Sequence, residues 1–274
     1  IESALREETS FLNQELDSWI FGILEDGWSR GSRRVQAEGE KGLSTYLHER
    51  FTGLGASLSH VLQALDAFRN EWGDLETPWM WSEEKIRSLA LFLRQQLFPI
   101  HIAANKADST KGEPWLAIES NGLVQPTMAD MELALRRADS GGLIEYSPGS
   151  DSFDIADESK LNPAQLNALS SMKEKLSQSG GTGVTNLISG VLFGALDHVV
   201  VYPVADENAW KDGEGKVLPD AFVVPNGIEA KALAYKVHTD LGDGFIRAVD
   251  GKTRRIVGAD HECRDSDVIK IHSK

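Results

Sequence analysis

The feature that most constrains the fold of this 274-residue chain is a short apolar run that ends in a polar loop. Residues 98–104 read FPIHIAA, and residues 105–108 read Asn-Lys-Ala-Asp. Before them, apolar residues recur at helical spacing over 86–97, behind Ser82 as an N-cap. A helix, a buried strand and a polar loop in this order predict an open α/β layer, whose ligand site lies at the carboxyl end of the strand.

The polar loop fits the pattern N-K-x-D, whose chemistry suits guanine. Guanine presents N1–H and N2–H₂ donors side by side, and one ionised carboxylate, Asp108, can accept both, whereas adenine offers no such pair. Asn105 can bond the base N7 or tie neighbouring loops together, and the aliphatic stem of Lys106 can cover a face of the base. Because a site built to satisfy polar groups rejects an analogue that leaves them unpaired, we predict that Asp108 sets the base specificity.

A second segment is predicted to reach the same site. Residues 115–118 and 123–124 are short strand candidates, and Thr127, Met128 and Ala129 precede an amphipathic helix. A strand, a short loop and a helix start form the place where GTPases put a motif whose backbone N–H groups meet the guanine O6. The Ser-Ala usual in that motif is Met128-Ala129 here. These three residues are therefore predicted nucleotide contacts.

The composition excludes some classes of protein and indicates a cellular location. No run approaches the ~18 apolar residues of a membrane span, and the single cysteine, Cys263, excludes an internal disulfide framework and argues against a cysteine-based metal site. We expect a cytoplasmic protein without membrane contact. The formal net charge of −14 argues against indiscriminate nucleic-acid binding by the whole molecule.

Periodicity divides the chain into three expected domains. Residues 1–80 have helical spacing and predict antiparallel helices, and residues 81–198 hold the α/β layer. Residues 199–274 alternate between apolar and polar positions, with a helix expected over 230–237, and predict a separate β-rich domain.

These pieces together resemble the archaeal branch of the Obg/YchF-related translation-associated GTPases. The resemblance rests on residues 100–108 and 127–129 and extends to four further segments, 19–24, 142–149, 234–245 and 267–271. It implies an α/β fold in which a partial P-loop GTPase layer carries a helical insert (1–80) and a C-terminal TGS domain of β-grasp fold (199–274). It also implies GTP as the ligand and the ribosome or RNA as a partner.

The phosphate motifs of such an enzyme are not found in the sequence. A GTPase needs G-x-x-x-x-G-K-[ST] for the phosphates and Mg²⁺. Gly251-Lys252-Thr253 matches the end of that motif, but its first glycine would fall on Ile246, and no D-x-x-G precedes Asn105. We expect these segments, and Mg²⁺ binding with them, to lie ahead of Ile1. The chain alone is then an inactive GTPase portion with no catalytic or metal-binding residue of its own.

The candidate RNA contacts are the basic residues Arg247, Lys252, Arg254 and Arg255, with Lys236 as a possible neighbour. A solvated hairpin is the simpler interpretation of this group. For the whole chain, the alternative to an enzyme is an RNA- or ribosome-docking module whose nucleotide layer is a non-catalytic remnant. The sequence upstream of Ile1 would separate the two hypotheses.

Overall fold

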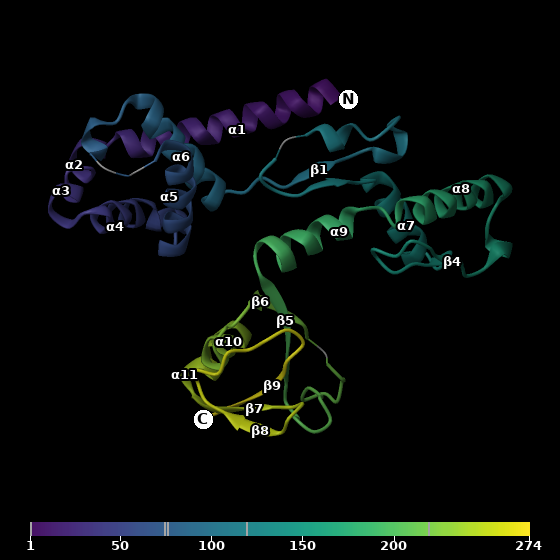
Figure 1. Cartoon of the computed structure of the whole chain (residues 1–274). Coiled ribbons are helices and arrows are strands. Elements are labelled where there is room, and N and C mark those ends of the chain that lie inside the picture. The colour runs from purple at the N-terminus through teal and green to yellow at the C-terminus, as the bar shows by residue number, and fades with distance from the viewer. Residues whose placement is uncertain (1, 74, 76, 119, 219) are drawn as a thin grey trace. The chain divides into compact units, whose positions relative to one another are not determined.

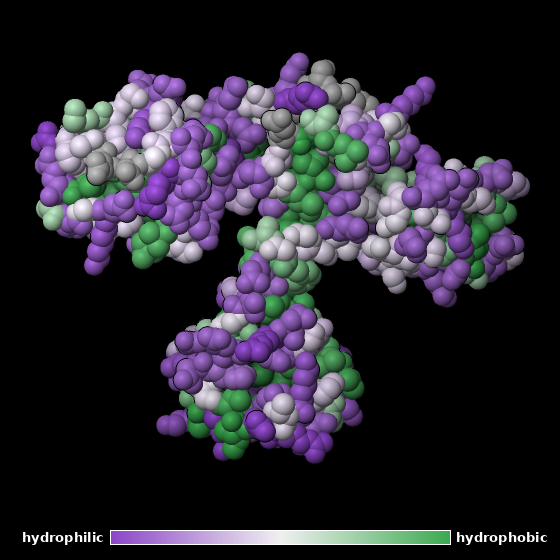
Figure 2. Space-filling model, in the orientation of Figure 1, coloured by the Kyte–Doolittle hydropathy of each residue, from purple (hydrophilic) through white to green (hydrophobic). Residues whose placement is uncertain are grey.

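The computed structural model describes residues 2–73, 75, 77–118, 120–218 and 220–274 (Figure 1). The chain divides into two compact units, unit 1 (Ile1–Val184) and unit 2 (Thr185–Lys274). In the part of the chain described, no helix is both long and apolar enough to cross a membrane. Hydrophilic residues cover most of the face drawn in Figure 2.

The first part of unit 1 is helical. Its elements are α1 (Glu2–Glu25), α2 (Trp28–Gly31), α3 (Arg34–Glu38), α4 (Glu40–Phe51), α5 (Leu58–Trp72) and α6 (Glu83–Leu97), with the 3₁₀ turns η1 (Thr52–Leu54) and η2 (Pro78–Met80). Ser57 caps α5, and the predicted cap Ser82 accepts a 3.3 Å bond from the amide of Lys85 at the start of α6. Gly39, with φ +63°, turns the chain between α3 and α4.

Helix packing buries a continuous apolar core in this part. Helix α6 packs against both α1 and α5, and α4 packs against α5. The fully buried large side chains of the core are Ile20, Leu24, Leu43, Leu47, Phe51, Phe68, Leu75, Leu89 and Leu93. At the far end of α6, buried Arg94 bonds Asp17 of α1 at 2.7 Å, which neutralises a charge that would be costly to bury alone.

The second part of unit 1 is a small α/β layer. Its elements are β1 (Ile102–Ala104), η3 (Ala107–Ser109), η4 (Pro114–Ala117), β2 (Val124–Pro126), α7 (Ala129–Ser140), β3 (Ile144–Glu145), β4 (Asp154–Ile155), η5 (Glu158–Lys160) and α8 (Pro163–Ser179). Strand β1 pairs with β2 in parallel, and β3 pairs with β4 antiparallel. The strand predicted over 115–118 is wrong: the segment forms η4, whose first residue, Pro114, has the φ of a helical turn and no N–H for a sheet.

Unit 2 is built on a five-stranded sheet. Its elements are the rest of α9 (Val184–Ser189), the π-helix η6 (Gly190–Ala195), β5 (His198–Val204), β6 (Phe222–Pro225), α10 (Ala230–Val237), α11 (Thr239–Asp243), β7 (Phe245–Asp250), β8 (Arg255–Val257) and β9 (Val268–Ser273). The strand order is β6-β5-β9-β7-β8, with β5 and β9 parallel and the other neighbours antiparallel. Helix α10 contacts β7 and β9 and coincides with the helix predicted from the sequence.

The chain forms two compact units, whereas the sequence predicts three domains, and the boundary near residue 199 lies earlier in the structure. Residues 185–198 group with unit 2, whereas the sequence placed them in the α/β layer. Three separate hydrophobic clusters lie within residues 20–93, 128–176 and 199–269. The division at 80/81 and 198/199 stays a prediction.

Candidate nucleotide-base site

The parallel pairing of β1 and β2 brings the two predicted site segments together. Ile102 pairs with Val124 and Ala104 with Pro126, so both strands end at the same edge of the pair. Residues 105–108 continue from one strand and residues 127–129 from the other. Two main-chain bonds join the segments, from the amide of Thr127 to the carbonyl of Ala104 (3.0 Å) and from the amide of Ala107 to the carbonyl of Thr127 (3.1 Å). The two segments are therefore adjacent, and their role as one nucleotide site stays a prediction.

The side chain of Asn105 ties the two segments together. Its Oδ1 accepts a 3.1 Å bond from the amide of Ala129 and a 3.4 Å bond from the hydroxyl of Thr127. Of the two roles predicted for Asn105, the structure therefore shows the tie between loops. Its Nδ2 group has no acceptor in the part of the chain that the structure describes, so two donors stay available to a ligand.

Lys106 and Asp108 lie on the exposed side of this loop. Lys106 has φ +63°, a left-handed conformation that non-glycine residues seldom adopt, and Thr110 Oγ1 fixes it by donating to its carbonyl at 2.9 Å. Asp108 lies in η3 with an exposed side chain, and one of its carboxylate oxygens accepts a 3.3 Å bond from the Ser109 hydroxyl. The other oxygen accepts no bond from the residues that the structure describes.

Lys175, which the sequence analysis did not identify, forms a hydrogen bond to the turn that contains Asp108. Lys175 of α8 donates from Nζ to the main-chain carbonyl of Asp108 at 3.2 Å. The two residues are 67 positions apart, so no local pattern could have revealed the contact.

The second segment is buried more deeply than the first. Thr127 and Met128 are almost inaccessible, and the side chain of Met128 belongs to the hydrophobic cluster of the layer. The amide of Met128 donates to the carbonyl of Thr182 at 2.8 Å, and that of Ala129 is engaged by Asn105. The next amides of α7, those of Asp130 and Met131, have no acceptor among the described residues.

A buried carboxylate that the sequence analysis also missed lies behind this segment. Glu132 of α7 accepts bonds from the Thr182 hydroxyl (2.5 Å), from Arg136 Nε (2.6 Å) and from the Tyr146 hydroxyl (2.8 Å). Burial raises the pKa of Glu132, but the three hydrogen bonds outweigh it and leave the pKa lowered. Burial, and then the bond to Glu132, raise the pKa of Tyr146.

The structure divides the predicted RNA contacts between two faces of a hairpin in unit 2. Arg247, Lys252, Arg254 and Arg255 all have exposed side chains. Arg255 of β8 lies opposite Asp250 of β7 in the strand register, so the two share a face of the hairpin. Alternation along β7 places Arg247 on the other face. Asp250 caps the turn, accepting bonds from the Lys252 amide (2.8 Å) and from the Thr253 hydroxyl (2.6 Å). Gly251-Lys252-Thr253 is thus part of a hairpin turn, as expected.

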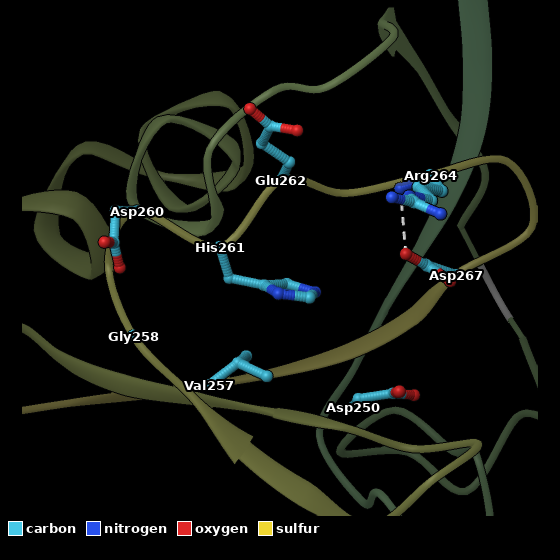
Figure 3. A pocket seen from close by; sticks show the side chains of 8 residues that line it. All are labelled: Asp250, Val257, Gly258, Asp260, His261, Glu262, Arg264 and Asp267. Carbon is cyan, nitrogen blue, oxygen red and sulfur yellow. Dashed lines mark hydrogen bonds between the residues drawn. The ribbon is translucent and has the colours of Figure 1, made fainter.

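A hollow of unit 2 lies beside that hairpin. It has a volume of about 650 Å³, and His261 points into it (Figure 3). Its lining residues are Asp250, Val257, Gly258, Asp260, His261, Glu262, Arg264 and Asp267. Among the residues that the structure describes, no group of three or more His, Cys, Asp or Glu side chains has an arrangement that could hold a metal ion.

Comparison with known proteins gives a consistent result for both units. Residues 103–206 match the family model described as Obg-like GTPase YGR210-like, G4 motif-containing domain, and residues 214–273 match the TGS domain. An uncharacterized GTP-binding protein of Methanocaldococcus jannaschii is 41% identical over 97% of this chain and 66% of its own length. An uncharacterized GTP-binding protein of Schizosaccharomyces pombe is 25% identical over 96% of this chain and 63% of its own length.

A solved structure extends the comparison to the fold. The crystal structure of a GTP binding protein from Pyrococcus horikoshii OT3 is 34% identical to this chain, covers 98% of it and superposes with a TM-score of 0.66. This chain covers 71% of that structure. It spans slightly less than two thirds of the curated relatives, at 66% and 63% of their lengths.

Proposed function

The chain belongs to the Obg/YchF-like family of GTP-binding proteins, and from that premise we propose that residues 105–108 and 127–129 form the guanine-binding part of a GTPase. The observation that carries the proposal is the Asn105 side chain, which joins the two segments through Ala129 and Thr127 while keeping its own donors free. Such a tie fixes the Asp108 turn and the start of α7 around one position.

Each group has a distinct role toward the base. Asp108 accepts N1–H and N2–H₂ of guanine, and the free Nδ2 of Asn105 donates to N7. The exposed stem of Lys106 covers one face of the ring. The start of α7 supplies main-chain donors to O6, and the open amides of Asp130 and Met131 favour this role because a helix start attracts a partial negative charge.

GTP hydrolysis requires contacts to the phosphates that the base contacts do not supply. GTP hydrolysis needs donors to the β- and γ-phosphates and Mg²⁺. The sequence holds no G-x-x-x-x-G-K-[ST] motif. The proposal is therefore that the 274-residue chain by itself binds GTP weakly and does not hydrolyse it. The complete gene product is the form in which GTPase activity is to be measured.

The test is a calorimetric titration of the complete gene product with GTP and ATP, for the wild type, Asp108→Ala and Asp151→Ala. Asp151 is an exposed carboxylate with no described bond in the same unit, so it controls for the lost charge. The wild type and the control should prefer GTP. Asp108→Ala should lose about 100-fold of that preference, because two donors of guanine are left unpaired at roughly 1–2 kcal/mol each. Equal affinity of the wild type for both nucleotides would overturn the proposal.

The proposal extends to unit 2, where the exposed basic hairpin is assigned to RNA or ribosome docking in translation, within the cytoplasm. It is supported by the exposure of Arg254 and Arg255 at the turn. Reversing both to Glu should weaken binding to ribosomal RNA and flatten its salt dependence, by about one unit of slope for each lost phosphate contact. Unchanged affinity and slope would leave the hairpin as a solvated surface.

A further inference from the structure

Glu132 is a buried carboxylate that the proposed base contacts do not use. It is 5% exposed, although it lies on α7 only a few residues beyond the segment assigned to the guanine O6. A buried charge without bonded partners is strongly destabilising, yet this one has three donors. The three bonds therefore hold the donor side chains in place around the carboxylate.

Thr182 connects Glu132 to the 127–129 segment through two hydrogen bonds. Its hydroxyl donates to Glu132 at 2.5 Å, and its main-chain carbonyl accepts the amide of Met128 at 2.8 Å. Glu132 therefore fixes Thr182, and Thr182 fixes the middle residue of the 127–129 segment. Because Glu132 and Thr182 are 50 residues apart, the link joins the start of α7 to the loop that follows α8.

The loop after α8 has little freedom to move. Gly183 has φ +77°, and a Cβ placed on it would lie 2.0 Å from the carbonyl of Pro126, at the end of β2. Only glycine allows so close an approach. On the other side of the loop, the amide of Gly181 bonds the carbonyl of Leu176 at 3.0 Å. A shift of Thr182 is thus transmitted to Met128 rather than absorbed by the loop.

We propose that Glu132 is a positioning residue for base selection, which sets through Thr182 the place of the main-chain donors that read the guanine O6. The inference rests on the proposed function of the 127–129 segment. It separates the base site into two halves: Asp108 reads N1 and N2, and the segment held by Glu132 reads O6. Variants of Glu132 should therefore affect one half only.

Two guanine analogues distinguish the halves. Inosine diphosphate lacks the N2 amine but keeps O6, so the ratio of GDP to IDP affinity reports on Asp108. 6-Thioguanosine diphosphate keeps N1–H and N2–H₂ but carries sulfur, a weak acceptor, in place of O6. The ratio of GDP to 6-thio-GDP affinity therefore reports on the main-chain donors at the start of α7, where the amides of Asp130 and Met131 have no acceptor among the described residues.

The experiment measures both ratios on the complete gene product for the wild type, Glu132→Gln, Thr182→Val and Thr182→Ser. Glu132→Gln and Thr182→Val should reduce the GDP to 6-thio-GDP ratio roughly tenfold, the equivalent of one charge-assisted hydrogen bond, and leave the GDP to IDP ratio unchanged. Thr182→Ser, which retains the hydroxyl, should keep both ratios. Glu145→Gln, at an exposed position on β3, is the matched control.

The outcomes separate the inference from the function on which it rests. If all nucleotides weaken equally in Glu132→Gln and Thr182→Val, or neither ratio changes, then Glu132 has only a structural role and the inference is wrong. The same holds if the wild type does not distinguish GDP from 6-thio-GDP. Failure of the proposed function appears differently, as a wild type that lacks preference for guanine over adenine nucleotides. Should Glu132→Gln fail to fold, Thr182→Val carries the same test.

Discussion

The five-stranded sheet of unit 2 and the β1–β2 pair of unit 1 are stabilised in different ways. The sheet of unit 2 has five paired strands, and α10 covers a core that includes Leu233, Ala248 and Ile269. The parallel pair β1–β2 has three residue pairs, and paired strands this short are marginal on their own. Polar side chains hold its loops instead, chiefly Asn105 and Glu132. Backbone pairing and packing therefore specify unit 2, whereas a few hydrogen-bonded side chains hold the loops of the candidate base site.

The largest expected effect is a loss of stability of unit 2 when its core is disrupted. Leu233 of α10 is fully buried against the sheet, so Leu233→Ala should destabilise unit 2 by about 2–5 kcal/mol through the cavity it leaves. Affinity of the complete gene product for GTP should stay within twofold of the wild type at a temperature where unit 2 remains folded. Urea unfolding followed by the fluorescence of Trp210, retained as the sole tryptophan, measures the first quantity and nucleotide titration the second. A parallel loss of GTP affinity would mean that the two units do not fold and function separately.

A smaller change in unit 1 should have the opposite consequences. Asn105→Ala removes the bonds to Ala129 and Thr127, at a cost of roughly 2 kcal/mol, and also a donor to the base. GTP affinity should fall at least 30-fold, while the stability of unit 2 should not change. Asn167→Ala, at an exposed amide of α8 in the same unit, serves as a control. An Asn105→Ala protein that binds GTP normally would contradict the tie between the two loops.

The smallest effect concerns pH. Hydrogen bonds hold the folded pKa of Glu132 below its ordinary value of 4.5, against the effect of burial. A depressed carboxyl pKa contributes stability that is present above the unfolded value and lost as the pH falls through the folded one. The stability difference between the wild type and Glu132→Gln, from urea midpoints, should therefore be constant above about pH 5.5 and shrink below 4.5. A difference that does not vary between pH 3 and 7 would show that folding leaves the pKa of Glu132 unchanged, against the expectation.

Local features of this fold could be predicted from the sequence, and distant contacts could not. The cap Ser82 and helix α10 follow from neighbouring residues, since capping and periodicity act over a few positions. The η4 turn was missed because three apolar residues suit a strand or a turn equally, and Pro114 decides between them.

The candidate site shows the same limit. The motif predicted Asn105, Lys106 and Asp108 as members of one loop and offered the tie between loops as one role of Asn105. Glu132, by contrast, reads as an ordinary surface residue of an amphipathic helix. Its burial depends on Thr182, which the chain brings back only after α8. Side chains recruited from so far along the chain leave no local pattern.

The Asp108 carboxylate is the group proposed to select guanine, and exchanging its acceptor for a donor tests this role most directly. Asp108→Asn places an amide N–H₂ where guanine has donors, whereas xanthine has a carbonyl oxygen at C2. Titration of the complete gene product with GTP and XTP should show a wild type that prefers GTP and an Asp108→Asn variant that prefers XTP. If the variant retains the wild-type preference for GTP, Asp108 does not contact the base and the account of the site is wrong.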